Sequence, residues 1–261
     1  MKLIQFLLLL NSFCASAQFN DLPIEKVYST NQNSVLDYQE NSASLTKQAS
    51  FRIGLLAQNW FSIEKLNACK IIFLKKFNNQ YYGVELSNKK WIDYRENEIN
   101  IYCAQKLSND FSIGVGIQSY IINSPESKSV FQLNGSVGIT IQLPPNVVVG
   151  ISSNHLKLKQ NNQPLFQSFL TTHSFGVGYD FTNQFNAAIK IVVQENNTAY
   201  FNYEFHYTLK KQVDFNLDFN TKTNAVGIST LLRLNKMNIE IVVNHHATLG
   251  FSSGFLFSNN N

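Results

Sequence analysis

The chain has 261 residues, of which 15% are charged and 13% aromatic, and its formal net charge at pH 7 is +4. This length suits one domain, and the charged share lies well below the roughly 25% of an ordinary soluble domain. So mild a positive charge excludes a strongly basic nucleic-acid-binding protein, and we expect no nucleic-acid partner. The shortage of charge favours a chain that is embedded in a membrane.

The first 17 residues have the three parts of a secretory signal peptide. Lys2 is the short basic part, residues 3–10 are apolar, and Ala15 and Ala17 form an A-x-A cleavage signal. We therefore predict export of the chain, with cleavage immediately before Gln18.

Residues 18–49 form a polar, irregular segment without a sustained period. We expect this N-terminal segment to be a plug or a periplasmic arm. After residue 17, no run approaches the roughly 18–20 apolar residues that a membrane helix needs. The exported chain is therefore expected to be either soluble outside the cytoplasm or a membrane β-barrel.

Alternation of apolar and polar residues recurs from residue 50 to residue 258. In residues 201–220, for example, apolar side chains take every second position of two runs joined by Lys210 and Lys211. A period of two predicts a β-strand with one apolar and one polar face. The predicted strands are residues 51–60, 67–76, 80–87, 98–106, 111–122, 130–143, 147–153, 172–181, 185–194, 201–209, 213–220, 223–234, 238–245 and 249–257.

The polar faces of these strands consist mostly of Asn, Gln, Ser, Thr and Gly, whereas a soluble sheet would turn Lys and Glu to water. Such residues suit a hydrated lumen, and small ones leave room inside: Gly114, Gly116, Gly138, Gly176 and Gly178. We therefore predict an all-β fold, a closed antiparallel transmembrane β-barrel of about 14 strands over residues 50–258, with a polar tail at 259–261. A soluble β-sandwich is the alternative.

The hairpin over residues 201–220 supplies candidate residues for both faces. Six aromatic side chains are predicted to face lipid or a membrane partner: Phe201, Tyr203, Phe205, Tyr207, Phe215 and Phe219. Four titratable side chains on the opposite face are predicted to form a polar network in the lumen: Glu204, His206, Asp214 and Asp218.

Catalytic and metal-binding motifs are missing from the sequence, so we predict that the protein is not an enzyme and holds no cofactor. His245 and His246 are the most conspicuous pair, but adjacent strand residues point to opposite faces and cannot chelate one ion. Asp214 and Asp218 are about 13 Å apart by strand rise, which is too far for a typical glycosidase pair.

The three cysteines leave two alternatives open. Lipidation of Cys14 would replace signal cleavage, although residues 11–13 form a poor context for it. A disulfide between Cys69 and Cys103 is allowed in an oxidising compartment. Cys103 shares an apolar strand face with Ile101, so the simpler interpretation is a small apolar side chain.

Three stretches resemble a known family. Asn41-Ser42-Ala43-Ser44-Leu45 is similar to the N-P-A-G-L motif that precedes the barrel in the long-chain fatty-acid transporter superfamily, with Ser in place of the Pro and the Gly. WIDYRENEINIYCAQKLSNDFSIGVGIQSYI and NHHATLGFSSGFLF resemble hairpins of the Bacteroidota members, which include the type IX secretion barrels. The resemblance implies a fourteen-stranded outer-membrane barrel.

The first functional hypothesis is a non-enzymatic accessory or scaffold subunit of a protein secretion or outer-membrane biogenesis complex. It is expected in the cell outer membrane, with outer-membrane lipid and other envelope proteins as partners. The second hypothesis is an outer-membrane channel or transporter for small hydrophobic or polar solutes. A soluble exported β-sandwich that binds a ligand is the third.

Overall fold

The computed structural model describes residues 36, 38–48, 50–92, 94–125, 127–161, 170–195 and 197–259. The predicted signal peptide, with Ala15, Ala17 and Gln18, lies outside the described residues, as do the first part of the N-terminal segment and the end of the polar tail. Within the described residues, no helix is both long enough and apolar enough to cross a membrane.

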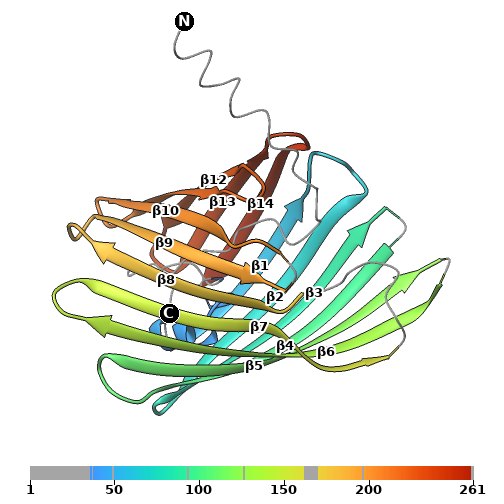
Figure 1. The fold of residues 1–261 in the computed structure, drawn as a ribbon. Coiled ribbons are helices and arrows are strands. Elements are labelled where there is room, and N and C mark those ends of the chain that lie inside the picture. Colours follow the sequence, from blue (N-terminus) through green and yellow to red (C-terminus); the bar gives the residue numbers. More distant parts are fainter. Residues whose placement is uncertain are drawn as a thin grey trace, which may run out of the picture.

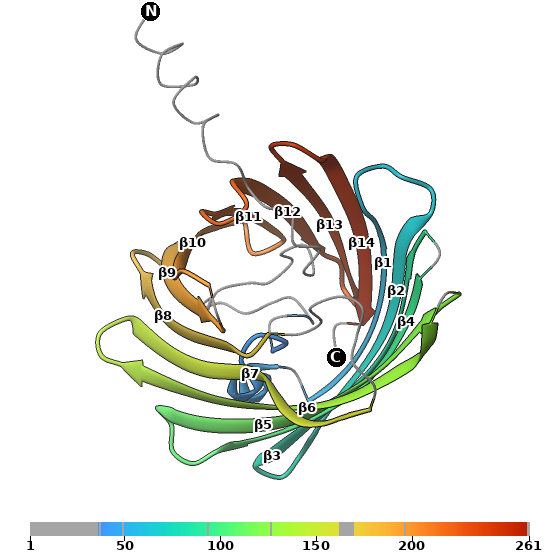
Figure 2. The ribbon, with the colours of Figure 1, turned by 45° about the vertical axis from the view of Figure 1, so that its right-hand side comes forward.

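The described part of the chain folds into fourteen antiparallel strands, and β1 pairs with β14 to close a barrel (Figures 1 and 2). Each strand otherwise pairs with its neighbours in sequence, so the connections are simple hairpins. The strands are β1 (Phe51–Asn59), β2 (Leu66–Phe77), β3 (Gln80–Trp91), β4 (Tyr94–Lys106), β5 (Phe111–Ser124), β6 (Ser127–Leu143), β7 (Val147–Asn161), β8 (Thr172–Asp180), β9 (Phe185–Gln194), β10 (Tyr200–Leu209), β11 (Val213–Asn220), β12 (Ala225–Arg233), β13 (Met237–His246) and β14 (Gly250–Asn259).

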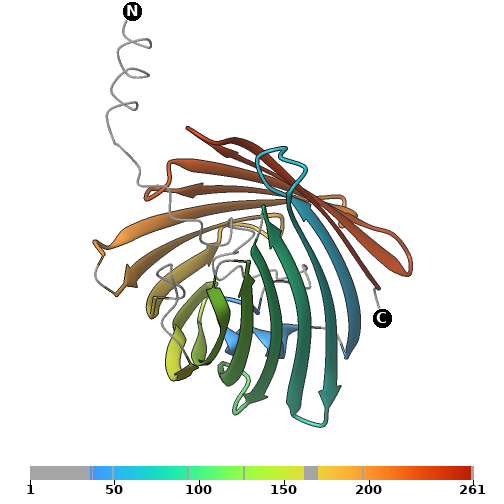
Figure 3. The ribbon, with the colours of Figure 1, turned by 90° about the vertical axis from the view of Figure 1, so that its right-hand side faces the viewer.

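The two ends of the barrel differ. At the terminal end, where β1 begins at Phe51 and β14 finishes at Asn259, the strands are joined by short turns such as residues 78–79 and 210–212. The opposite end, called the loop end here, carries the long connection between β7 and β8. Strands β2–β7 have 12–17 residues and the others 8–10, so one side of the barrel is taller (Figures 1 and 3).

The outer face of the barrel is a belt of exposed apolar side chains drawn from every strand. On β5, for example, Val115 and Ile117 are exposed, while Gly114, Gly116 and Gln118 alternate with them on the inner face. Soluble monomers rarely expose apolar patches larger than a few hundred Å². A belt that encircles the molecule therefore faces lipid, and the predicted fold class, a closed antiparallel transmembrane barrel, is confirmed.

The inner face is mainly polar. Among the described residues, buried polar side chains outnumber buried apolar ones, and most of them are Asn, Gln, Ser and Thr at alternate positions of the strands. Charged residues on this face are paired: Lys70 Nζ lies 2.8 Å from Glu85 Oε1, and Lys89 Nζ lies 2.5 Å from Glu98 Oε1. Pairing offsets part of the free energy that is lost when a charge leaves water.

Strands β3, β4 and β7 each extend at least four residues further toward the loop end than the sequence predicts. The charged stretch Tyr94–Glu98 belongs to β4 and is not a loop, because Lys89 on β3 reaches both Glu96 and Glu98 and makes the charges acceptable within the wall. Likewise β7 continues to Asn161, where the sequence predicts a polar loop, because the long β6 supplies hydrogen-bonding partners up to that point.

The outer belt predicts a depth-dependent effect of a new charge. Leu217, in the middle of β11, is 43% exposed on the outer face, and Leu217→Arg is expected to lower the free energy of unfolding in phospholipid vesicles by about 2–4 kcal/mol. The control Gln212→Arg, in the turn that precedes β11, is expected to change it by less than about 1 kcal/mol. Urea titration measures both, and equal effects at the two depths would contradict the assignment of the belt.

Candidate functional site: a plug segment on the inner wall

A short segment that precedes β1 lies inside the barrel. It comprises residues 36 and 38–48, called the plug segment here, and contains the 3-10 helix η2 (Ser42–Lys47), which contacts β3, β4, β5 and β6 (Figure 2). Asn41 caps this helix, because its Oδ1 accepts a hydrogen bond from the backbone N–H of Ala43 at 3.1 Å. The stretch that resembles the N-P-A-G-L motif therefore forms the turn that meets the wall.

Glycines of the wall leave the space that the plug segment occupies. A Cβ on Gly114 would lie 2.4 Å from the backbone of Ser42 and Ala43, and a Cβ on Gly138 would lie 2.0 Å from Asn41 Oδ1. Both distances are far below van der Waals contact. The sequence predicts these glycines as spacers that leave room in the lumen, and the structure shows that the plug segment fills that room.

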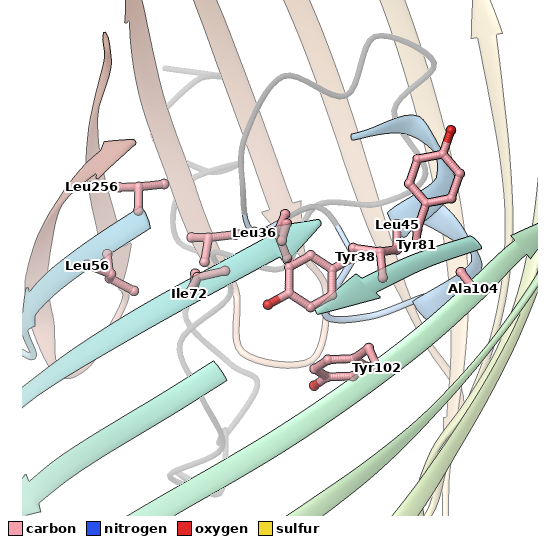
Figure 4. Packing of buried hydrophobic residues seen from close by; sticks show 10 residues of the cluster. Leu36, Tyr38, Leu45, Leu56, Ile72, Tyr81, Tyr102, Ala104 and Leu256 are labelled. Atoms are coloured by element: carbon pink, nitrogen blue, oxygen red, sulfur yellow. The ribbon is translucent and has the colours of Figure 1, made fainter. Parts of the chain in front are cut away.

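An apolar cluster holds the other side of the plug segment. Figure 4 shows Leu36, Tyr38 and Leu45 of the plug segment beside apolar side chains from β14, β1, β2, β3 and β4. The rings of Tyr38 and Tyr102 meet edge to face, with centroids 5.0 Å apart, an arrangement that adds about 0.5–1.5 kcal/mol to the burial of their surface. The wall residues of the cluster are Leu56, Ile72, Leu74, Tyr81, Tyr102, Ala104 and Leu256.

Glu85 on β3 joins the plug segment to the wall by hydrogen bonds. Its carboxylate accepts from Tyr38 Oη at 3.2 Å and from Gln39 Nε2 at 2.7 Å, and it also pairs with Lys70. Burial and the neighbouring Glu85 carboxylate raise the pKa of Tyr38 well above its ordinary value, so the phenol keeps its proton and donates. Glu85 itself is 1% exposed, so removal of the plug segment would strip two donors from a buried charge.

Further contacts spread the plug segment across the barrel. Asn41 Nδ2 donates to the carbonyl of Ile139 at 3.0 Å, and Thr46 Oγ1 donates to Ser112 Oγ at 3.0 Å. At Glu40, the backbone carbonyl accepts from Asn154 on β7 at 2.7 Å, and the carboxylate forms an ion pair with Lys190 on β9. The plug segment thus connects the side of the barrel with the longer strands, β5–β7, to β9 on the side with the shorter strands.

The predicted lumen network on β10 and β11 separates into two parts. His206 Nε2 lies 3.4 Å from Asp214 Oδ1, and Asn186 lies 3.1 Å from the other ring nitrogen of His206. Asp214 also accepts from Thr208 Oγ1 at 2.7 Å and forms an ion pair with Arg233. This half of the network lies toward the terminal end and is anchored by a cation that the sequence prediction did not include.

Glu204 and Asp218 form the second part, nearer the loop end. They are direct cross-strand partners, and Glu204 is 1% exposed. Two adjacent carboxylates repel each other, and a cation between them would relieve the repulsion. Within the described residues, however, no three His, Cys, Asp or Glu side chains are grouped so as to hold a metal ion.

The aromatic residues of the same hairpin lie on its outer side. Phe201, Phe205, Tyr207 and Phe215 are exposed, while Tyr203 and Phe219 are partly buried because their rings stack on each other, with centroids 6.4 Å apart. Whether lipid or a protein partner covers them stays a prediction.

The histidine pair lies on opposite faces of β13. His245 is exposed with its ring 4.6 Å from that of Phe251, whereas His246 is buried and its Nδ1 accepts from the backbone N–H groups of Thr248 and Leu249, each at 3.2 Å. His246 therefore shapes the β13–β14 turn.

The two cysteines of the barrel are free thiols, so the disulfide alternative is wrong. Cys69 lies on β2 and Cys103 on β4, and β3 separates the two strands. Cys69 is exposed on the outer face.

Glu85 and Lys190 anchor the plug segment, and the sequence prediction missed both. Within the predicted strands 80–87 and 185–194, each is the single charge on the polar face, which is costly unless a partner is present. That signal indicates a buried partner for each of them, but not that the N-terminal segment supplies it.

No family model and no curated protein matches the sequence. The barrel is nevertheless similar to solved structures. The monoaromatic hydrocarbon channel CymD is 11% identical, with a TM-score of 0.58 over 87% of this chain and 91% of CymD. The P. putida toluene transporter TodX is 8% identical, with a TM-score of 0.61 over 85% and 92%. A Pseudomonas aeruginosa FadL homologue is 8% identical, with a TM-score of 0.50 over 84% and 91%.

At such identities the likeness establishes a shared fold alone. The fourteen-stranded barrel that the family resemblance implies is the fold that is observed. The further link to Bacteroidota and to type IX secretion receives no support from these three structures.

Because the plug segment packs directly against Gly114, we predict that a side chain at this position displaces it. Gly114→Val places atoms where the backbone of Ala43 lies, so a cysteine introduced at Ser44, which is 1% exposed, is expected to react at least several-fold faster with a water-soluble maleimide. The control Gly254→Ala, also on the inner face, meets nothing closer than 3.5 Å and should leave the rate unchanged. An unaltered rate in Gly114→Val would contradict the packing of the plug segment against this glycine.

Proposed function

We propose that the protein is a non-enzymatic outer-membrane channel that moves small solutes through the barrel past the plug segment. The observation that carries the proposal is the way the plug segment is held. Its helix rests on glycines and is tied by side-chain hydrogen bonds and the Glu40–Lys190 ion pair. Hydrogen bonds of this kind contribute about 0.5–1.5 kcal/mol each, so the attachment is specific and reversible.

The lengths of the connections at the two ends of the barrel support an outer-membrane location. Short turns at one end and a long connection at the other are typical of outer-membrane barrels, whose short turns lie in the periplasm. We assign the terminal end to the periplasm on this basis. The predicted signal peptide provides the route of export.

Transport is better supported than the accessory role that the sequence placed first. The solved structures with the same fold are called hydrocarbon channels and toluene transporters. The barrel also carries its own plug segment, which a purely structural subunit does not require. Recovery of stoichiometric envelope partners from native membranes in mild detergent would favour the accessory role instead.

Purified protein reconstituted into liposomes tests the channel directly. We expect uptake of D-glucose or of small ions by the wild type above that of protein-free liposomes, and several-fold faster uptake by Gly114→Val, because the displaced plug segment opens the lumen. Gly254→Ala should match the wild type. Liposomes that stay closed to D-glucose and to ions with the wild type and with Gly114→Val would overturn the proposal.

A further inference from the structure

Three side-chain amides form a continuous row on the inner wall near the plug segment. Asn100 on β4 pairs in register with Gln118 on β5, and Gln118 pairs with Asn134 on β6. Gly114 and Gly138 are the glycines against which the plug segment packs. Gln118 follows Gly114 by four residues, and Asn134 precedes Gly138 by four. The amide row, as we call these three residues, therefore lies on the loop-end side of the plug segment.

Each amide of the row has one half fixed by a neighbour. The three bonds run from Asn100 Nδ2 to Glu85 Oε1 at 3.2 Å, from Gln118 Nε2 to Tyr102 Oη at 3.3 Å, and from Gln132 Nε2 to Asn134 Oδ1 at 2.9 Å. The bond to the Glu85 carboxylate sets the orientation of Asn100, since only the NH₂ group can donate to it.

The other half of each amide lacks a hydrogen-bonding partner within the part of the chain that the structure describes: Asn100 Oδ1, Gln118 Oε1 and Asn134 Nδ2. These side chains are only 3%, 5% and 0% exposed. A buried polar atom without a partner costs about 1–3 kcal/mol, and native proteins usually supply one. Three such atoms in one row are available to hydrogen-bond a bound molecule.

The free donor and acceptor atoms of the row determine which chemical group can bind there. A hydroxyl group both donates and accepts, so one hydroxyl can bridge Gln118 Oε1 and Asn134 Nδ2, and a neighbouring hydroxyl can donate to Asn100 Oδ1. An ammonium group only donates and a carboxylate only accepts. The adjacent charges also give little attraction for an ion, because Glu85 is paired with Lys70, and Glu98 with Lys89.

Aromatic residues complete the surroundings. Tyr102 contacts Gln118 directly, and Tyr120 lies two residues beyond Gln118 on the same face of β5; both rings are buried. Planar amides beside aromatic rings suit a ring that carries hydroxyls on its edge and C–H groups on its faces.

We propose that the amide row is a binding subsite for a small uncharged solute with adjacent hydroxyl groups, such as a sugar or polyol. This inference rests on the proposed channel function and names its substrate class. It separates the protein from the hydrocarbon channels and toluene transporters that share its fold.

Equilibrium dialysis of D-glucose against the detergent-purified full chain tests the subsite. Asn100→Leu and Gln118→Leu replace the amide by an apolar group, so the acceptor is lost together with the donor to Glu85 or to Tyr102. Each is expected to weaken glucose binding about fivefold, the loss of one hydrogen bond. The matched control is Asn216→Leu on β11. It removes a buried amide that is already bonded to Ser229 Oγ at 2.8 Å, and glucose affinity should stay at the wild-type value.

Heat-modifiable migration on a gel reports whether each variant is folded. If the leucine variants fail this check, Asn134→Asp replaces the Nδ2 donor by oxygen at constant size, and the same weakening is expected. Glucose binding that is undetectable in the wild type, or equal in the wild type and the row variants, would overturn the proposed subsite. The amide row would then bind water only. Liposomes that conduct ions in that case would leave the channel standing, whereas liposomes closed to D-glucose and to ions alike refute the channel itself.

Discussion

In hydrocarbon, every backbone N–H and C=O group needs a partner within the protein, and the pairing of β1 with β14 meets this constraint for the whole molecule. The register from Gly54↔Ser258 to Asn59↔Ser253 joins the first strand to the last and leaves no sheet edge in the lipid. Once the sheet is closed, each side chain of a strand points either to lipid or to the interior. The alternation of residues then becomes a division between two environments.

Closure creates a second constraint, because the interior is confined and partly dry. Several charged groups there form ion pairs, such as Lys70 with Glu85 and Lys89 with Glu98, which offsets the free energy lost when a charge leaves water. At Gly114 and Gly138, where the wall has no side chain, the plug segment supplies the missing volume. The lumen is therefore organised by complementarity between the wall and a segment that lies outside the sheet.

The strands, their pairing and the closed barrel were predictable from the sequence, since a period of two depends on local residue type alone. The sequence left open whether the N-terminal segment is a plug or a periplasmic arm, and the place where the plug segment meets the wall was not predictable. A glycine such as Gly114 has no side chain to indicate what packs against it, so the sequence predicts open space where the structure has a contact. Lys89 and Glu96 fall between the predicted strands 80–87 and 98–106, because charged residues interrupt the alternation there. Their mutual pairing depends on the register of β3 and β4.

The predicted network of four titratable residues was incomplete because a local sequence pattern does not give distances between residues on different strands. Asp214 and His206 are close because β10 and β11 form a hairpin, and that much follows from the sequence. Arg233 joins them from the far end of β12, where a basic residue close to a turn gives no reason to expect an inward direction. Local pattern identifies the face of a residue, but not its distance from residues on other strands.

The contacts of the plug segment also have a consequence for the order of folding. Asn41 meets Thr140 across 99 residues of chain, and Glu40 meets Lys190 across 150. Contacts this distant in sequence form late, because the loop entropy must first be lost elsewhere. The first element of the barrel region to leave the ribosome is therefore among the last to reach its place, and a half-assembled barrel has an empty lumen. An assembly factor that recognised a vacant interior would distinguish unfinished molecules from finished ones.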